Sequence, residues 1–442
     1  MKTLLNLKKI SLFTLCLCLL LVSLTSAKRT TKKTLRPLPL TSVHVVDRNG
    51  FSETISNKER LAQFQNVDFL TTQPYQKVLR IYMRDSKGNV RSVVTSYHTN
   101  GNPKQFLEIL NGRAFGSYWE WHENGKPRVM AKVIGGTADI IATAEKSWLF
   151  DDITYAWDED GRVLAQIPYS QGVLEGVVAY YHSSGKPWKK IPYSKGQIHG
   201  TMEIYREAGD LLQQTPYVQG VKHGTAFRFW EPNQIASQEE YHQGSLGNGQ
   251  YFDKKGQLVA QIKQGTGYRA IFGKDSISEL QEYQQGNLEG EIKVFTSQGY
   301  LKRIYHVKAN IKHGEEVEYY DTPMARVDNL EEESLKPKLS FCWYEGKIHG
   351  SVKSWYLNGN LESQREISSN TKNGVCTAWY QDGNLMLIEE YDKDKLIRGD
   401  YFKKAEKLPV SQVIQGKGIA TLFDSQGHFI QKVTYNNGSP DE

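Results

Sequence analysis

A glycine followed five residues later by an aromatic residue recurs along most of this 442-residue chain. Ten such pairs are clear, and Gly374 with Trp379 makes an eleventh. The glycines at 176, 200 and 224, at 290 and 314, and at 350 and 374 follow one another at steps of 24 residues. A fixed period of this length indicates a repeat array, in which each unit buries its apolar side chains only against its neighbours. The ten pairs are Gly116 and Trp121, Gly176 and Tyr181, Gly200 and Tyr205, Gly224 and Phe229, Gly247 and Phe252, Gly267 and Phe272, Gly290 and Phe295, Gly314 and Tyr319, Gly350 and Trp355, and Gly418 and Phe423.

Each unit has the pattern of two short strands separated by tight turns. In the unit that opens at Gly200, a first strand ends at Tyr205, a turn follows around Gly209, and a second strand runs to Tyr217. Short strands joined this tightly pair antiparallel with their sequence neighbours, and 24 residues leave no room for a crossover helix beside them. The pattern therefore predicts an all-β fold: an elongated, single-layer antiparallel meander of about 14 β-hairpin repeats with a small N-terminal cap.

Departures from the period divide the chain into segments. Two steps of 36 residues, from 116 to 152 and from 314 to 350, indicate insertions near residues 137–147 and 322–337, the second containing Glu331–Glu333. Before the array, Asn57–Phe64 is expected to form a short helix and Val78–Met83 the first strand. We expect a signal peptide over residues 1–27, a basic disordered linker over 28–40, the cap over 41–91, the repeat array over 92–435 and a tail over 436–442.

The N-terminal residues have the pattern of a secretory leader. Lys8 and Lys9 precede an apolar run over Ile10–Leu24, and small residues end at Ala27. This pattern predicts export through a cleaved signal peptide, to the periplasm, the cell surface or the extracellular space. Leader and linker together carry eight basic residues and no acidic one, so subtracting eight from the net charge of +6 leaves −2 for the remainder. A near-neutral body argues against nucleic-acid binding, whereas the basic linker suits a weak contact with a membrane or cell-wall surface.

The two cysteines that follow the leader are expected to stay apart. Three strand crossings separate Cys342 from Cys376, which corresponds to roughly 14 Å at about 4.8 Å per crossing. A disulfide requires Cα atoms within about 7 Å. We therefore predict no disulfide and two partly buried thiols.

Catalytic and metal-binding patterns are not evident in this sequence. The recurrent histidines His199, His223, His313 and His349 are at least one repeat apart. One repeat is two strand spacings, or about 10 Å, whereas the donor atoms of one zinc site must converge to within about 4 Å. Adjacent carboxylates such as Glu389 and Glu390 point to opposite faces of a strand. We expect no metal, no cofactor and no enzymatic activity.

The rows of side chains allow two arrangements of the sheet faces. The residues two places after the glycines are mostly apolar, and their parity is opposite to that of the aromatics five places on. Either a β-bulge switches the face along each strand, or both faces carry apolar residues and one of them is a groove. We expect the aromatics to form a ladder that joins repeat to repeat. The ladder residues are Trp121, Tyr181, Tyr205, Phe229, Phe295, Tyr319, Trp355 and Trp379.

A second aromatic row follows the ladder directly in three units. Tyr320, Tyr356 and Tyr380 each come immediately after a ladder residue, so a flat strand would turn them to the opposite face. In a single-layer sheet that row would lie on an accessible surface bordered by polar turns. Aromatics exposed in this way commonly mark an interaction site, so these three tyrosines are the candidate binding residues.

The joints between units resemble MORN repeats of the bacterial variant, whose relatives are often labelled YwqK-like antitoxin proteins. The resemblance rests on YSKGQIHG at Tyr193–Gly200, YVQGVKHG at Tyr217–Gly224, WYEGKIHG at Trp343–Gly350 and the turn YLNGN at Tyr356–Asn360. It implies a binding or scaffolding protein without catalytic residues. With the leader, it leads us to expect an exported, non-enzymatic protein-interaction module of the bacterial envelope with a protein partner. Two alternatives stay open: a cell-wall carbohydrate-binding repeat protein, or a peripheral membrane-binding protein.

Overall fold

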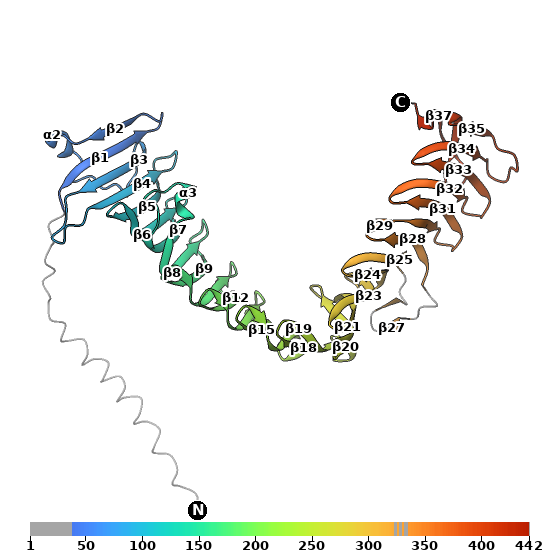
Figure 1. Ribbon diagram of the computed structural model, residues 1–442, viewed down its shortest axis with the longest axis horizontal. Helices are drawn as coiled ribbons and strands as arrows, with labels where there is room; N and C mark the ends of the chain where they lie inside the picture. Colours follow the sequence, from blue (N-terminus) through green and yellow to red (C-terminus); the bar gives the residue numbers. More distant parts are fainter. Residues whose placement is uncertain (1–37, 322–324, 327–328, 331–334, 442) are drawn as a thin grey trace, which may run out of the picture.

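The computed structural model of the chain describes residues 38–321, 325–326, 329–330 and 335–441 (Figure 1). The expected signal peptide, nearly all of the linker and the Glu331–Glu333 triplet lie outside these residues. The described strands form one open antiparallel sheet of 36 strands, with a separate two-stranded piece. The sheet bends into a U, with the first and last strands at the tips of its arms and β18 to β21 at its base. The predicted all-β, single-layer meander is confirmed.

The strands are short and follow one another at nearly regular intervals. In the N-terminal part they are β1 Leu40–Asp47, β2 Ser52–Ile55, β3 Tyr75–Tyr82, β4 Arg91–Tyr97, β5 Pro103–Leu110, β6 Arg113–Trp121, β7 Pro127–Gly135, β8 Leu149–Trp157, β9 Val163–Ser170, β10 Val173–Leu174, β11 Gly176–Tyr181, β12 Pro187–Ser194 and β13 Gln197–Ile198. In the middle they are β14 Gly200–Tyr205, β15 Leu211–Val218, β16 Val221–Lys222, β17 Gly224–Glu231, β18 Gln234–His242, β19 Ser245–Phe252, β20 Leu258–Lys263, β21 Thr266–Phe272, β22 Ile277–Gln284, β23 Asn287–Phe295, β24 Leu301–Lys308 and β25 Ile311–Tyr319. After them come β26 Ala325–Arg326, β27 Asn329–Leu330, β28 Pro337–Tyr344, β29 Lys347–Ile348, β30 Gly350–Trp355, β31 Leu361–Ser368, β32 Thr371–Trp379, β33 Leu385–Asp392, β34 Lys395–Tyr401, β35 Ser411–Ile414, β36 Lys417–Phe423, β37 Phe429–Asn436 and β38 Ser439–Pro440.

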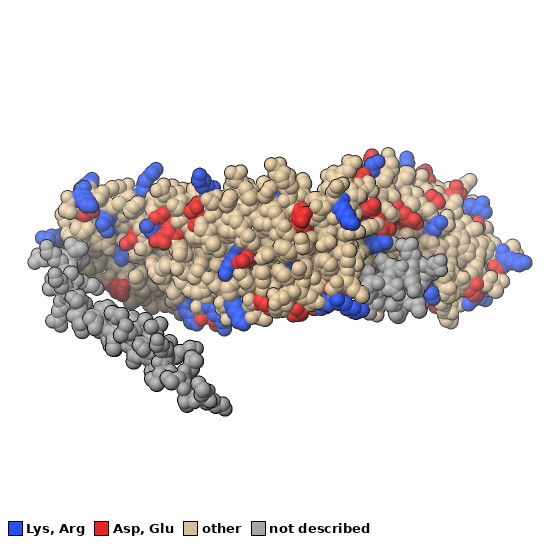
Figure 2. Space-filling model, turned by 90° about the horizontal axis from the view of Figure 1, so that it is seen from below, with Lys and Arg blue, Asp and Glu red and all other residues tan. Residues whose placement is uncertain are grey.

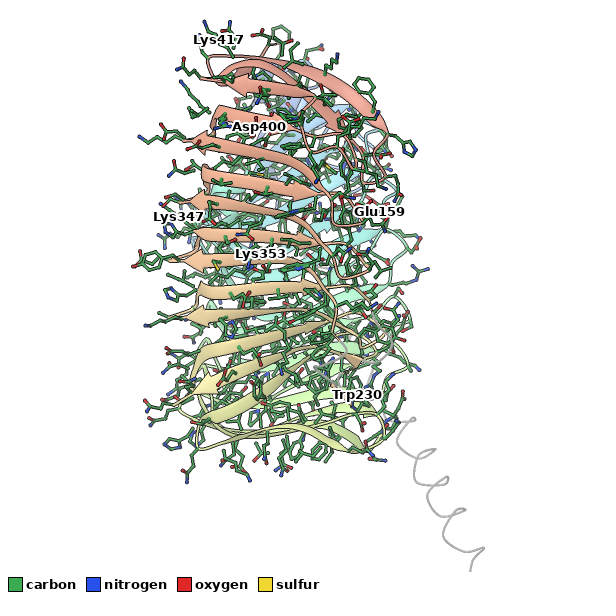
Figure 3. All side chains as sticks on the ribbon, turned by 90° about the vertical axis from the view of Figure 1, so that its right-hand side faces the viewer. Glu159, Trp230, Lys347, Lys353, Asp400 and Lys417 are labelled. Carbon is green, nitrogen blue, oxygen red and sulfur yellow. The ribbon has the colours of Figure 1, made fainter. Side chains whose placement is uncertain are left out.

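The two edges of the sheet carry different turns. On the hairpin edge, where Lys347 lies in Figure 3, two-residue turns join the strands. Gln219 and Gly220 in one of these turns have φ of 50° and 81°, the left-handed geometry that matches the twist of a tight hairpin. On the opposite loop edge, where Glu159 and Trp230 lie, the turns are longer. There the amide of Gly185 donates to the carbonyl of His182 at 2.9 Å.

The N-terminal cap contains two strands that the repeat period did not reveal. The expected helix is α2, Lys58–Leu61, which begins after Asn57, whose side chain accepts from the amide of Glu59. The prediction that Val78–Met83 is the first strand is wrong, because β1 and β2 precede β3 and β1 pairs with both. In β1, Val43 and Val45 are buried in a cluster with Leu61, so packing forms this strand without the glycine–aromatic signature.

The insertions add contacts to the sheet. The first contains the short helix α3, Ala142–Glu145. Its Ala144 and the nearby Trp148 are buried, and the Trp148 ring lies 4.8 Å from that of Tyr118 on β6. In the second insertion, Leu335 packs against the core cluster around Tyr251. Within the described ranges no helix has the length and apolar character needed to cross a membrane.

The two thiols lie on different faces of the sheet. Cys376 on β32 is opposite Glu389, and Cys342 on β28 is opposite Glu315. Both cysteines are unpaired and half-buried, and three strand steps separate β28 from β32. Burial raises the pKa of both thiols above the ordinary value. The strand assignment behind the predicted separation is therefore confirmed.

Candidate protein-binding surface

Each face of the sheet carries its own row of apolar side chains. We call the face of the residues two places after the leading glycines the aliphatic face; it holds Val178 and Ala226, both buried. The opposite, aromatic face is best defined between β6 and β17. There the ring of Trp121 stacks on Trp119 at 6.0 Å and that of Phe229 on Phe227 at 6.4 Å, so each ladder residue shares the face of the residue two places before it.

A β-bulge occurs in these strands, but it does not switch the face. The pairing register shifts at the step into the ladder residue, as at Tyr205 on β14 and Trp355 on β30. The hydroxyl of Tyr205 still donates to the carboxylate of Glu203, two residues earlier, at 2.6 Å. Burial, with Glu203, raises the pKa of Tyr205 to about 12. The face switch that the sequence left open is therefore wrong, and both faces carry apolar residues.

The predicted ladder residues fall into two environments. Trp121, Tyr181, Tyr205 and Phe229 are half-buried on the aromatic face, and the hydroxyl of Tyr181 donates to the side chain of Gln166 at 3.0 Å. Phe295 is buried in the core cluster, and Tyr319 packs against that cluster. Trp355 and Trp379 are half-buried. The aromatics contribute to packing between strands throughout the array, but they do not form one uniform ladder.

The three candidate tyrosines tie neighbouring units together at the loop edge. The hydroxyl of Tyr320 donates to the carbonyl of Trp355 at 2.7 Å, and that of Tyr356 to the carbonyl of Trp379 at 2.8 Å. The hydroxyl of Tyr380 donates to the carbonyl of Phe402 at 2.7 Å. We call this contact the inter-repeat staple. It satisfies a backbone carbonyl at the point where the strand leaves its ladder of hydrogen bonds.

The expectation that this row lies on an accessible surface is wrong for Tyr380, which is fully buried. Burial raises the pKa of Tyr380 to about 12. Tyr320 and Tyr356 are half-buried. The physical reason is the turn that follows the ladder residue: it folds the next side chain across to the neighbouring unit instead of turning it to solvent. A role for these three residues in binding remains a prediction.

Sequence reasoning missed the other members of this row. His98, His122 and His182 direct Nε2 to the carbonyls of Trp121, Trp157 and Tyr205, which makes Nε2 the donor. The guanidinium of Arg206 donates to the carbonyl of Phe229, and the indole of Trp230 donates to that of Phe252 at 2.8 Å. The sequence could have identified these residues, because each follows the ladder position directly and has a long side chain with a hydrogen-bond donor.

A stripe of mostly apolar side chains crosses six strands on the aromatic face. The apolar stripe consists of Ile153, Pro168, Val177, Pro192, Thr201 and Pro216, from β8, β9, β11, β12, β14 and β15. Ile153 is opposite Pro168, Val177 opposite Pro192, and Thr201 opposite Pro216. Ile153 is 39% exposed and Val177 51% exposed. The stripe therefore presents apolar side chains to solvent on a face without a covering layer.

The prolines fit these internal strands because the ladder is interrupted beside them. The pairing between β9 and the next crossing breaks at Glu175, between β10 and β11, so the missing N–H of Pro168 leaves no ladder hydrogen bond unmade. Gly176 follows with φ of 106°, and a Cβ there would lie 3.2 Å from the Pro168 ring. The proline ring thus packs on a glycine of the neighbouring strand. The same contact recurs between Pro192 and Gly200.

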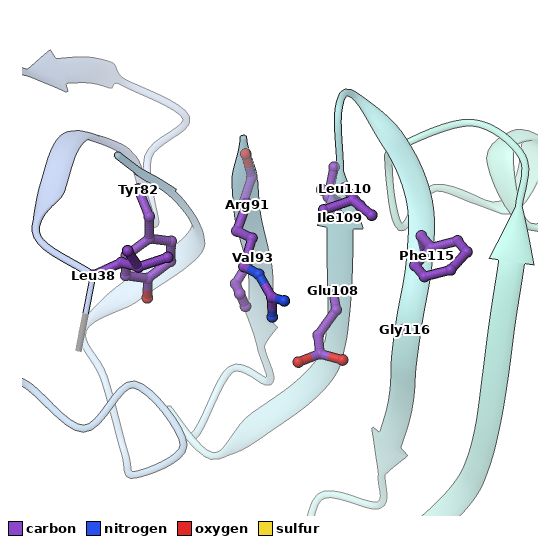
Figure 4. Close-up of a pocket in the computed structure, with 10 residues that line it drawn as sticks. Leu38, Tyr82, Arg91, Val93, Glu108, Ile109, Leu110, Phe115 and Gly116 are labelled. Carbon is purple, nitrogen blue, oxygen red and sulfur yellow. The ribbon is translucent and has the colours of Figure 1, made fainter. Parts of the chain in front are cut away.

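A separate hollow of about 350 Å³ lies near the N-terminal arm (Figure 4). Leu38, Tyr82, Arg91, Glu108 and Phe115 contribute to its lining. The carboxylate of Glu108 already accepts from the amide of Ser117 at 2.7 Å. This hollow combines apolar walls with one guanidinium and one carboxylate, which suits binding more than proton transfer.

Charges of both signs are mixed on the underside of the U. Figure 2 shows Lys, Arg, Asp and Glu scattered over this side, with wide uncharged areas between them. The recurrent histidines lie on the hairpin edge, where Nδ1 of His223 accepts from the amide of Gln243 at 3.4 Å. Its ring lies 5.2 Å from that of His242. These contacts place the histidines in turn packing.

The family model described as "MORN repeat variant" matches residues 174–195 and 348–367. Among curated proteins, none matches the chain. Solved structures titled "Crystal Structure of TcdB2-TccC3-Cdc42" and "Crystal Structure of TcdB2-TccC3-TEV" align with 86% and 88% of this chain, at 11% and 10% identity and a TM-score of 0.16. The chain spans about a quarter of their length, 25% and 24%. The two matched segments are thus similar to MORN repeat variants, and repeats of this kind indicate a repeat-based protein-interaction module.

Proposed function

We propose that the protein is an exported, non-enzymatic scaffold of the bacterial envelope that binds a protein partner through the apolar stripe on its aromatic face. The observation that supports this most is the stripe itself. Its side chains come from consecutive strands, and the described helices pack on other parts of the sheet. Exposed apolar surface of this kind on a rigid sheet commonly marks a protein contact.

The shape of the sheet also favours a binding role. The described strands of the array pair with the strands before and after them in one open sheet, so both broad faces are presented over many repeats. The stripe is held by backbone pairing on both sides, which keeps its side chains in place before a partner arrives. A preorganised surface loses less conformational entropy on binding than a flexible one.

The test is capture of partners by the mature protein, residues 28–442, from its native envelope fraction. A double variant, Ile153→Lys with Val177→Lys, places two charges in the stripe and should reduce capture at least tenfold. The matched control is Ser117→Lys with Thr225→Lys, two equivalent positions of other units, each directly after a leading glycine, that lie outside the stripe. The control should capture like the unmodified protein, and both variants should unfold at similar denaturant concentrations.

Equal capture by the stripe variant and by the control would show that the stripe is not the binding surface.

Export is tested in the same preparation. N-terminal sequencing should begin at Lys28, the residue after the expected cleavage site. A protein recovered with Met1 from a cytosolic fraction would contradict export.

The stacked aromatic pairs support a second candidate, a carbohydrate-binding repeat protein. Trp119 with Trp121, and Tyr155 with Trp157 at 5.7 Å, present half-buried rings on the aromatic face. Sugar rings stack on such aromatics through their C–H faces. Binding to a cell-wall glycan that is lost in Trp119→Ala and kept in the stripe variant would favour this candidate over the protein partner.

A further inference from the structure

Three glutamates are buried on the aliphatic face, and one of them has no cationic partner. Glu239, Glu316 and Glu389 are 9%, 5% and 9% exposed. Burying a carboxylate is unfavourable unless a cation or several hydrogen bonds compensate it. Nε of Arg269 lies 2.8 Å from Glu239, and Nζ of Lys312 lies 2.6 Å from Glu316. Across the described part of the chain, Glu389 makes no ion pair with a lysine, arginine or histidine.

The surroundings of Glu239 are repeated almost completely around Glu389. The carboxylate of Glu239 accepts from the hydroxyls of Tyr241 and Tyr251, at 2.7 and 2.8 Å. The carboxylate of Glu389 accepts from those of Tyr391 and Tyr401, at 3.0 and 2.8 Å. Each equivalent residue lies 150 positions further along the chain. We call the two arrangements the first and the second glutamate frame.

The backbone of the two frames is the same. Glu239 is opposite Gly249, and Glu389 is opposite Gly399. A Cβ at either glycine would lie 2.6 Å from the hydroxyl oxygen of the tyrosine two residues on. Glycine is therefore required in both frames so that Tyr251 or Tyr401 can fold back to the glutamate. Because both frames have a glycine opposite the glutamate and a tyrosine folded back over it, they hold their carboxylates in the same way.

The frames differ at the position that supplies the cation. In the first frame, Arg269 stands two residues after Gly267, whose Cβ would meet the carbonyl of Gln261. In the second, Ala420 stands two residues after Gly418, whose Cβ would meet the carbonyl of Gln412. The second frame thus keeps the carboxylate and the tyrosines but lacks the guanidinium that completes the first.

The cations that border the second frame do not replace this guanidinium. Nζ of Lys372 lies 4.6 Å from the centre of the Tyr391 ring. Lys222 makes the same contact with Tyr241, also at 4.6 Å, in the frame that contains Arg269. Arg365 is separated from Glu389 by Cys376 on the intervening strand, and it donates to the hydroxyl of Ser363 at 3.2 Å.

We propose that the second glutamate frame is a receptor site for an arginine side chain of a polypeptide partner. Glu389 would accept two N–H groups of the guanidinium, as Glu239 does from Arg269, because the planar fork of arginine matches a carboxylate. Tyr391 and Tyr401 supply the hydroxyls that hold the carboxylate, and half-buried Tyr435 lies at the rim of this cluster. The site is on the face opposite the apolar stripe, so it does not depend on the proposed function.

The first experiment measures binding of three peptides to the mature protein by NMR titration. They are acetyl-Gly-Arg-Gly-amide and its lysine and citrulline counterparts. The arginine peptide should shift the tyrosine signals of the second frame with at least tenfold higher affinity than the citrulline peptide, which has the shape but no charge. Glu389→Gln should weaken arginine binding at least tenfold. Equal binding of the arginine and citrulline peptides would overturn the proposal.

Two further variants exchange the difference between the two frames. Ala420→Arg supplies the missing side chain from within, so it should block peptide binding and raise the midpoint of thermal unfolding. Arg269→Ala opens the first frame and should create a second arginine site. Unchanged binding in Ala420→Arg, or a single site in Arg269→Ala, would contradict the assignment. Free argininamide that binds as tightly as the peptide would identify a small-molecule site in place of a polypeptide one.

Discussion

At the scale of single residues, the side chain after the ladder position decides how repeats are joined. Tyr356 and Tyr380 donate to backbone carbonyls one unit further along, and His182 and Trp230 do so elsewhere with different chemistry. The common requirement is a donor of sufficient length at this place. Tyrosine, histidine and tryptophan meet it equally, so the row is not uniform in sequence although it is uniform in geometry.

Tyr380→Phe should lower the free energy of unfolding by about 1–2 kcal/mol, because it leaves the buried carbonyl of Phe402 without its donor. Tyr380→Ala should cost about 3–5 kcal/mol, since it also opens a cavity at a fully buried ring. Leu357→Ala, in the equivalent turn of the preceding unit, removes an exposed side chain; it is the control and should change stability by less than about 0.5 kcal/mol. Urea denaturation measures all three. Loss of partner capture by Tyr380→Phe with unchanged stability would instead assign this tyrosine to binding.

At the scale of strands, a buried ion pair joins β18 to β21 across the two strands between them. Glu239 lies at the centre, with hydrogen bonds from Arg269, Tyr241 and Tyr251. Burial alone would raise the pKa of Glu239, but the hydrogen bonds and the charge of Arg269 outweigh it and lower the pKa below the ordinary value. A carboxyl whose pKa is lowered by folding stabilises the fold above its unfolded pKa.

The stability that Glu239 contributes should therefore be complete above about pH 5 and be lost as the pH falls through its lowered pKa. In Glu239→Gln, the urea midpoint should depend less on pH between about pH 5 and pH 2 than in the unmodified protein. At neutral pH the variant should be less stable by about 3–5 kcal/mol, since Arg269 is left buried without its partner. Glu240→Gln, on the opposite face, is the control. An identical pH dependence in Glu239→Gln would show that this carboxyl does not titrate with folding.

At the scale of the whole molecule, the fold is a chain of strands that pair with their nearest neighbours. Each crossing pairs with the one before and the one after, and the U in Figure 1 results from many small bends. In such an array a unit adds its own contacts and one interface to the total stability. The units that begin at Gly200 and Gly224 pair with their partner strands in the same register, since each of these glycines is opposite a tyrosine.

Deletion of residues 200–223 should therefore leave a folded protein with one unit fewer. Gly224 would follow His199 directly and occupy the place of Gly200, so the register of the array is kept. Circular dichroism should remain that of a β-protein, and the urea m-value should fall modestly because less surface is exposed on unfolding. Deletion of 200–211 breaks the period and should give an insoluble or unfolded product. Equal behaviour of the two deletions would show that the 24-residue unit is not the building block.

The sequence by itself determined the architecture, because period, turn residues and strand length are local properties that neighbouring units share. It also located α2, because the helical pattern over Asn57–Phe64 is likewise a local property. Only the tertiary structure decided where Tyr380 points, since the turn after Trp379 folds that ring onto the next repeat. The pairing of Glu239 with Arg269, and its absence at Glu389, also depend on contacts across three strand steps. Periodicity places residues along the chain, whereas packing across strands decides which of them are buried, paired or left open.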